Sequence, residues 1–226
     1  MAKTTKTKTT KKKTKASCPT DDLIKSLCGD LTPMQAVGCQ VRRSFPWILF
    51  SGLYAAIVIH YAGMRPDLSE ALHSGVFLFE LVLVGVTALF AAFSSISMTV
   101  PDMQGRKWLK PVSFTLMAVF FLWALTQWIA GGMSLPHFHW GHCINQGAIL
   151  GLIPIAMLLY MTKRGSTTTP VLMSIMNVTA VGALAYIALR LTCMVDDVGH
   201  IFFFHVLPFL VIGTLLGALA RKIYNW

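Results

Sequence analysis

The sequence predicts an all-α membrane protein, a bundle of six transmembrane helices preceded by short cytoplasmic N-terminal helices. Of its 226 residues, 55% are hydrophobic and only 12% are charged, and the mean hydropathy is +0.63. About 20 apolar residues span the hydrocarbon core of a bilayer, and six runs of the chain reach that length. Lys and Arg cluster in every second connection between these runs, as in polytopic membrane proteins. Within a bundle over residues 44–222, the expected spans are about 44–63, 74–97, 111–131, 144–162, 171–192 and 201–220.

Residues 1–18 form a tail rich in Lys and Thr. Such a segment has almost no apolar surface to bury, so we expect it to be disordered. It is not a secretory signal, because the first apolar run begins only near Ser44. A basic tail can indicate nucleic-acid binding, but beside a membrane it also suits anionic lipid head groups. The lipid bilayer is therefore the expected partner, and no direct contact with nucleic acid is expected.

Residues 19–43 are expected to form a cytoplasmic amphipathic segment of two short helices. Thr20 is a plausible N-cap of the first helix, Gly29 ends it, and Pro33 suits the first position of the second. Apolar residues recur at helical spacing in the first helix and form a stripe of Leu23, Ile24, Leu27, Cys28 and Leu31. Helices this short cannot bury such a stripe alone. The stripe either lies on the membrane surface or docks a soluble partner.

The basic residues near the expected spans predict the orientation. They precede span one, separate spans two from three and four from five, and follow span six: Arg42, Arg43, Arg106, Lys107, Lys110, Lys163, Arg164, Arg221 and Lys222. With six spans these clusters all fall on one side, which the positive-inside rule assigns to the cytoplasm. The loops of the other side hold a single basic residue, Arg65. Both termini are therefore expected in the cytoplasm.

Two cysteines fall on the expected outer side, Cys143 at the start of span four and Cys193 at the end of span five. These spans are consecutive and joined by a short loop, so their outer ends can be neighbours. In an oxidising compartment such a pair has two alternatives. It is a disulfide that joins two helices, or it binds a soft metal or is oxidised on a signal. The spacing leaves both open.

Histidines gather on the same side as this cysteine pair. Imidazole together with thiolate suits Zn, Cu and similar ions, so the candidate metal ligands are Cys143, Cys193, His139, His142 and His200. A histidine also suits the membrane interface, because its ring has an apolar body and a polar tip. We expect no required cofactor. If these residues bind a metal, a soft or borderline ion such as Zn, Cu or Cd would act as a signal.

Glu80 is the only acidic residue within an expected span. A carboxylate inside the bilayer needs a partner or must be neutral. Arg190 lies at a comparable depth in span five, three residues before Cys193. We expect a Glu80–Arg190 ion pair that couples span two to span five, with a protonated Glu80 as the alternative.

No catalytic constellation is evident, so no enzyme is expected. The sequence contains no motif-supported grouping of nucleophile, histidine and acid, no phosphate loop and no intramembrane carboxylate pair. Two other functions stay open. A metal or small-solute transporter would use Glu80 and the histidines along a polar path, and a haem-binding membrane redox subunit would use two histidines as axial ligands.

Several short motifs, taken in order, resemble one family. Asp22-Leu23-Ile24, Leu27, Asp30-Leu31 and Pro33, followed by Arg42-Arg43 and an apolar span, resemble the start of the NrsF-like proteins. These are bacterial six-span negative regulators of extracytoplasmic-function sigma factors. Further matches over about residues 20–222 are Phe79-Glu80-Leu81, the stretch from Ala91-Ala92-Phe93 to Val100-Pro101, Cys143 and Cys193.

The resemblance implies an anti-sigma factor of the bacterial inner membrane. Its cytoplasmic segment would hold an extracytoplasmic-function sigma factor away from RNA polymerase, through Leu23, Ile24, Leu27, Leu31 and Pro33. Its outward cysteines, Cys143 and Cys193, would sense heavy metal or oxidative stress and release the sigma factor. The Lys/Thr tail and the many histidines beside Cys143 depart from the family pattern, and the second departure points to metal sensing rather than thiol oxidation.

Overall fold

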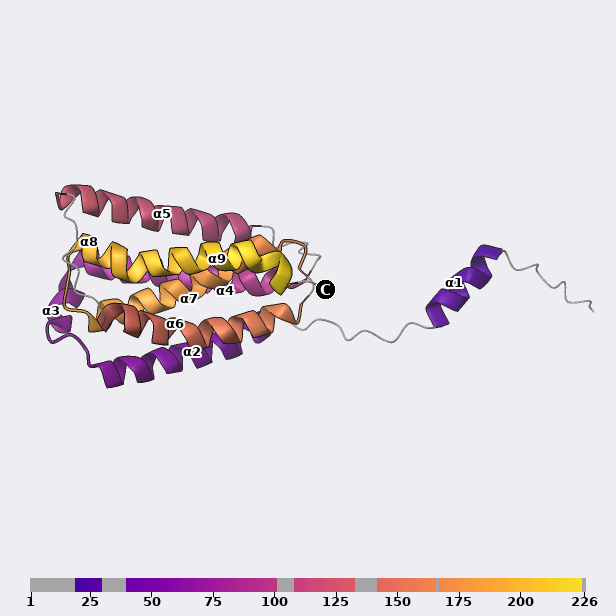
Figure 1. The fold of residues 1–226 in the computed structure, drawn as a ribbon, viewed down its shortest axis with the longest axis horizontal. Coiled ribbons are helices and arrows are strands. Elements are labelled where there is room, and N and C mark those ends of the chain that lie inside the picture. The colour runs from indigo at the N-terminus through magenta and orange to yellow at the C-terminus, as the bar shows by residue number, and fades with distance from the viewer. Residues whose placement is uncertain (1–18, 30–39, 101–107, 133–141, 166, 225–226) are drawn as a thin grey trace, which may run out of the picture. The chain divides into compact units, whose positions relative to one another are not determined.

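The structure, a computed structural model, describes residues 19–29, 40–100, 108–132, 142–165 and 167–224 (Figure 1). These ranges are helical and contain no strand. Six of the helical segments are long and apolar enough to cross a membrane, so the predicted fold class is confirmed. The chain divides into two compact units, residues 1–37 and residues 38–226, which are described separately.

In the first unit, helix α1 (Pro19–Gly29) is the described element. It begins one residue before the predicted cap Thr20, because a proline suits the first helical position. The apolar side chains Leu23, Ile24 and Leu27 of α1 are all more than half exposed. Three parts of the predicted N-terminal region lie outside the described residues: the 1–18 tail, Leu31 and Pro33.

The second unit is a bundle of long helices whose expected and observed bounds differ by a few residues. Its elements are α2 (Gln40–Ala62), α3 (Leu68–His73), α4 (Gly75–Ser97), α5 (Leu109–Ala130), α6 (His142–Lys163), α7 (Pro170–Thr192), α8 (Val198–Ile201), the π-helical turn η1 (Phe202–Val206) and α9 (Leu207–Ile223). The sixth span is continuous from α8 through η1 to α9. The short helix α3 was not predicted.

Helix α7 lies at the centre of the bundle and α5 at its edge (Figure 1). The central helix packs against α2, α4, α6 and α9. Small buried side chains of α7, such as Ala180, Ala185 and Ala188, let these neighbours approach closely. Helix α5 packs mainly against α4 and exposes apolar side chains such as Leu122 and Ile129. A helix at this edge of the bundle would contact lipid, while α7 is surrounded by protein.

The end of the bundle that holds both cysteines is here called the cysteine end. It contains the C-terminal ends of α2 and α7 and the N-terminal ends of α4, α6 and α8. Helix α2 ends there because Gly63 follows it with φ +85°, a conformation that suits glycine. Helices α3 and α4 are separated by Ser74, whose extended backbone breaks the helical path.

The π-helical turn η1 follows from the proline at position 208. Pro208 has no N–H, and its ring would collide with the carbonyl of Phe204 four residues earlier in a regular α-helix. The chain widens instead, and the N–H of Leu207 donates to the carbonyl of Phe202, five residues before it. Such single π turns are frequent at functional sites, and this one contains His205.

Candidate functional site at the cysteine end

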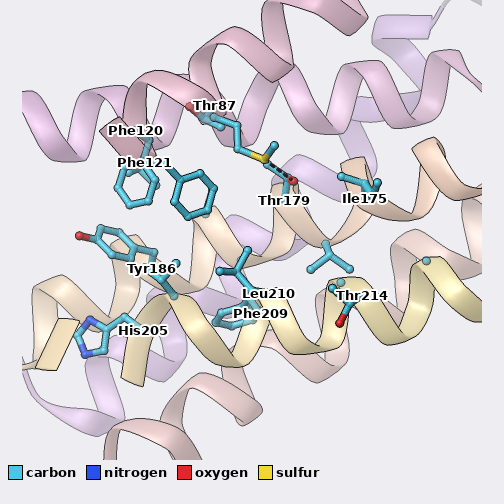
Figure 2. Close-up of a pocket in the computed structure, with 18 of the residues that line it drawn as sticks. Thr87, Phe120, Phe121, Ile175, Thr179, Tyr186, His205, Phe209, Leu210 and Thr214 are labelled. Carbon is cyan, nitrogen blue, oxygen red and sulfur yellow. Dashed lines mark hydrogen bonds between the residues drawn. The ribbon is translucent and has the colours of Figure 1, made fainter. Parts of the chain in front are cut away.

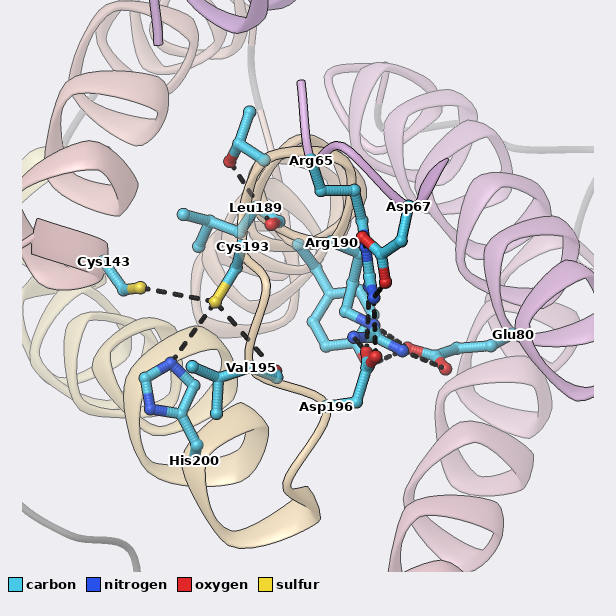
Figure 3. Close-up of polar contacts among 12 residues, drawn as sticks. Arg65, Asp67, Glu80, Cys143, Leu189, Arg190, Cys193, Val195, Asp196 and His200 are labelled. Carbon is cyan, nitrogen blue, oxygen red and sulfur yellow. Dashed lines mark hydrogen bonds and ion pairs between the residues drawn. The ribbon is translucent and has the colours of Figure 1, made fainter. Parts of the chain in front are cut away.

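The two cysteines meet across consecutive helices. Cys143 is the second residue of α6, and Cys193 directly follows the last residue of α7. The backbone of Cys193 is extended, with ψ 131°, while its N–H still donates to Leu189 at 2.8 Å. The thiol of Cys143 donates to Sγ of Cys193 across 3.6 Å (Figure 3). Both are free thiols in the structure.

His200 is the first imidazole at this thiol pair. Its Nε2 lies 3.5 Å from Sγ of Cys193 (Figure 3). The side chain of Asp197 caps α8 by accepting a hydrogen bond from the backbone N–H of His200 at 2.9 Å. This cap fixes the start of a four-residue helix and therefore the position from which the imidazole reaches the thiol.

His205 is the second imidazole, and it was not in the predicted set of metal ligands. Its side chain is 1% exposed, and neither ring nitrogen makes a hydrogen bond within the described part of the chain. One ligand atom each from Cys143, Cys193, His200 and His205 lies within 4.8 Å of all the others. In a regular α-helix, residues five apart point about 140° away from each other. The π turn brings His200 and His205 to one site, and Pro208 was the sequence signal for it.

Two other predicted ligands are not brought to this site. His139 lies outside the described residues, and the side chain of His142 is not described although its backbone begins α6. Metal binding by the predicted set therefore stays a prediction, with His205 as an addition from the structure.

The predicted partners Glu80 and Arg190 form a salt bridge beside the thiols. Nε of Arg190 lies 2.8 Å from Oε1 of Glu80, and both side chains are almost fully buried. Arg190 also donates to Asp196 at 2.7 Å. Its guanidinium carbon lies 4.9 Å from the ring centroid of Phe77, a distance suited to a cation–π contact. The pair thus couples α4 to α7, and Asp196 extends it into the loop that follows Cys193.

A second arginine extends this ionic network to the loop after α2. Arg65 is 3% exposed, and its Nη2 lies 2.6 Å from both Asp67 and Asp196. The hydrogen bonds that Arg65 donates to these two carboxylates raise the pKa of Arg65. The Arg65 guanidinium in turn lowers the pKa of Asp196 to about 2. The only basic residue of the predicted outer loops is therefore fully paired, and its backbone N–H donates to Leu191 of α7 at 3.1 Å.

Tyr186 joins the ionic network to the cysteine site. Its hydroxyl donates a short hydrogen bond to Glu80. Its ring stands edge-on to the ring of His205, with centroids 6.1 Å apart. If His205 moves, it therefore displaces Tyr186, which is hydrogen-bonded to the buried ion pair.

The same two side chains lie at one end of an apolar pocket of about 530 Å³ (Figure 2). Helices α4, α5, α7 and α9 contribute to its walls, which include Phe120, Phe121 and Phe209. No Asp, Glu, Lys or Arg is among the lining residues. In the described part of the chain this pocket offers no charged path of the kind that an ion transporter needs.

The geometry allows two kinds of chemistry at the thiol pair. The 3.6 Å between the sulfur atoms must shorten to about 2.05 Å for a disulfide. A metal ion can instead bind both sulfurs without a bond between them. The hydrogen bond from Cys143 lowers the pKa of the Cys193 thiol, and the thiolate is the form that either attacks an oxidant or ligates a metal.

Comparison with known proteins gives one family. The chain matches the family described as negative regulator of sigma F over residues 27–226. No match was found among curated proteins or among solved structures. The matched range includes the whole bundle and the last residues of α1. The protein thus belongs to the NrsF family, the negative regulators of sigma F, and its described residues include six helices of membrane-spanning length.

Proposed function

We propose that this protein is an inner-membrane anti-sigma factor that holds an extracytoplasmic-function sigma factor in the cytoplasm and releases it when Cys143 and Cys193 react with heavy metal or an oxidant. The observation that carries the proposal is the 3.6 Å approach of the two sulfurs across α6 and α7. Any ligand or bond formed there changes the packing of these two helices.

Helix α2 provides a route from the cysteines to the N-terminal segment. It packs against both α6 and α7. Trp47 of α2 donates to the carbonyl of Pro154 in α6 at 3.0 Å, and Tyr54 donates to Ile149 in α6 at 2.8 Å. Since Cys143 lies in the first turn of α6, movement of this helix acts directly on α2. The segment that precedes α2 in the chain, residues 19–43, is the proposed docking segment.

The exposed apolar face of α1 supports a docking role for that segment. Leu23, Ile24 and Leu27 lie on one face of a helix that also bears Asp21 and Asp22 in its first turn. An apolar face of this kind fits the helix-in-groove mode of recognition. Leu31 and Pro33 complete the proposed set of contacts. Sequestration by protein contact requires no catalysis, so the protein acts as a regulator.

The sensing half of the proposal is tested in cells with a reporter of sigma-dependent transcription. Cys143→Ser and Cys193→Ser should each abolish the response to cadmium, chromate and peroxide, because either change removes one member of the pair. Both variants should share one phenotype, locked on or locked off. Cys28→Ser, an exposed cysteine of α1, is the matched control and should respond as the wild type does. Normal responses in both bundle variants would refute cysteine sensing.

The docking half is tested by placing a carboxylate on the apolar face of α1. Leu23→Asp and Leu27→Asp should abolish capture of the sigma factor by membranes that contain the full chain. Burying even a neutral polar group without a hydrogen bond costs roughly 2–7 kcal/mol, and burying an unpaired carboxylate costs more. Ser26→Asp adds the same charge outside the apolar stripe and should leave capture unchanged. Equal capture by all three variants would exclude α1 as the docking surface.

A further inference from the structure

We infer that Cys143, Cys193, His200 and His205 form a four-ligand site for one soft or borderline divalent cation of the Zn²⁺ or Cd²⁺ type. The inference rests on the proposed function, since it names the stimulus that the same cysteines recognise. It adds two histidines from the last span, one of them in a π turn, and it assigns a metal ion rather than an oxidant as the ligand of the site.

Two of the distances between the ligand atoms match the edges of a tetrahedral site. Bond lengths of about 2.3 Å to sulfur and about 2.05 Å to nitrogen give edges of about 3.8 Å between two sulfurs and about 3.6 Å between sulfur and nitrogen. The structure has 3.6 Å between the sulfurs of Cys143 and Cys193, and 3.5 Å between Cys193 and Nε2 of His200. All four ligand atoms lie within 4.8 Å of one another, so a pair at this upper limit would need to shorten by about 1.2–1.5 Å.

The state of His205 is the observation that favours a ligand over simple packing. Burial of an imidazole without a hydrogen bond to either nitrogen is unfavourable. His205 is 1% exposed, and neither ring nitrogen meets hydrogen-bond geometry within the described residues, although the Cys193 thiol lies near enough to interact with the ring. A metal ion at the thiols would use one of these nitrogens. The π turn that points His205 at the site also costs regular helical hydrogen bonding, which a metal–nitrogen bond would offset.

Charge balance also favours this ion class at the end of a membrane bundle. Two thiolates and two neutral imidazoles around a divalent cation give a site with no net charge, so the complex carries little desolvation penalty. Binding releases the two thiol protons to solvent and involves no oxidation. The neighbouring ionic network holds three carboxylates against two arginines, which leaves an excess negative charge that attracts a cation.

Soft thiolates select against Mg²⁺ and Ca²⁺, which prefer oxygen ligands. Four protein ligands from α6, the end of α7, α8 and η1 also leave no open position for a substrate. The ion would therefore be a structural signal that draws three segments together around Cys193. It would not be a catalytic centre.

The inference is tested on the reduced full-length protein in lipid nanodiscs, titrated with Co²⁺ and then with Cd²⁺. One equivalent of Co²⁺ should give the intense visible bands of tetrahedral cobalt and thiolate-to-cobalt charge transfer in the near ultraviolet. Cd²⁺ should displace it at one equivalent. His205→Leu and His200→Leu should each weaken Cd²⁺ binding at least about tenfold. His60→Leu, an exposed histidine near the end of α2, is the matched control and should bind as the wild type does.

Weak octahedral cobalt bands, or equal Cd²⁺ affinity in the wild type and both site variants, would overturn the inference. If His205→Leu does not fold, the wild-type cobalt spectrum and the His200→Leu titration decide the question. The outcome is separable from the proposed function. If the protein does not bind metal but the cysteine variants no longer respond in cells, the proposed function stands and only the metal site is refuted. Metal binding with cysteine variants that respond normally would instead remove the sensing role.

Discussion

The two ends of the bundle are held together by different chemistry. At the cysteine end, the joint between helices consists of charged side chains: Glu80, Arg190, Asp196, Arg65 and Asp67. At the opposite end it consists of neutral groups. There the amide of Asn177 donates to Tyr224 at 2.8 Å and to Thr162 at 3.2 Å, and it accepts from Ser95. These four side chains join α4, α6, α7 and the residue after α9.

The neutral end is also packed more tightly. A Cβ added at Gly165, just after α6, would lie 2.3 Å from Cβ of Thr99 and 2.7 Å from its carbonyl oxygen. Backbone that approaches this closely leaves little room for rearrangement. By contrast, the cysteine end contains a buried imidazole whose nitrogens lack hydrogen-bond geometry in the described residues, and two free thiols. If the proposed metal site is correct, the bundle has one fixed end and one end whose packing changes when the ion binds.

The largest loss of stability is expected when one member of the buried ion pair is removed. Arg190→Met should lower the free energy of unfolding by about 3–5 kcal/mol, because it leaves the Glu80 carboxylate buried without its cation. Denaturant unfolding in mixed micelles would measure this. The double variant with Glu80→Gln should recover much of the loss, since no unpaired charge remains. A single-variant cost below about 1 kcal/mol would mean that the pair does not hold this end.

A smaller effect is expected from the neutral end. Asn177→Leu removes the amide from Tyr224, Thr162 and Ser95, and buried hydroxyls that lose a partner cost about 1–3 kcal/mol. The same unfolding measurement applies, with the exposed Asn145→Leu as a control that should change little. The response of the reporter to metal should persist in Asn177→Leu. Loss of the response with full stability would contradict a fixed, non-sensing end.

The smallest effect is expected at the exposed edge of the ionic network. The Asp196 side chain is 54% exposed, so Asp196→Asn should cost less than about 1 kcal/mol after screening by solvent. The pKa of Asp196 falls from 3.8 to about 2 on folding. Its contribution is therefore present above pH 3.8 and is lost as the pH falls through 2. The difference between wild type and variant should shrink toward pH 2 and in high salt. A pH-independent difference would show that charge is not its cause.

Much of the fold could be predicted because membrane spans have a strong local signal. The six apolar runs are long, and the structure contains six helices of span length. The short helix α3 was missed because six residues between two spans leave no hydrophobic period to detect. Glu80 and Arg190 were predicted to pair because buried charges in a membrane need partners, and the structure brings them together.

The other contacts at the site join residues far apart in the sequence and leave no periodic pattern that could predict them. Arg65 was noted only as the single basic residue of its side, and its pairing with Asp196 joins positions 131 residues apart. His205 was left out of the predicted ligand set, and in a regular α-helix it would point away from His200. Only the consequence of Pro208 for the preceding turn brings the two rings to 5.4 Å between centroids. The predicted ligands His139 and His142 belong to a connection whose side chains the structure does not describe.

The π turn also sets the rotation of α8 relative to α9. It holds one residue more than an α-helical turn would, so the helix before it and the helix after it are out of phase. Deletion of one residue within Phe202–Val206, combined with Pro208→Ala to remove the ring that blocks a regular helix, should restore α-helical geometry and rotate α8 by about 100° relative to α9. His200 would then leave Cys193 while α9 kept its packing on α7. The deletion with this substitution should therefore separate the two imidazoles without unfolding the span that carries them.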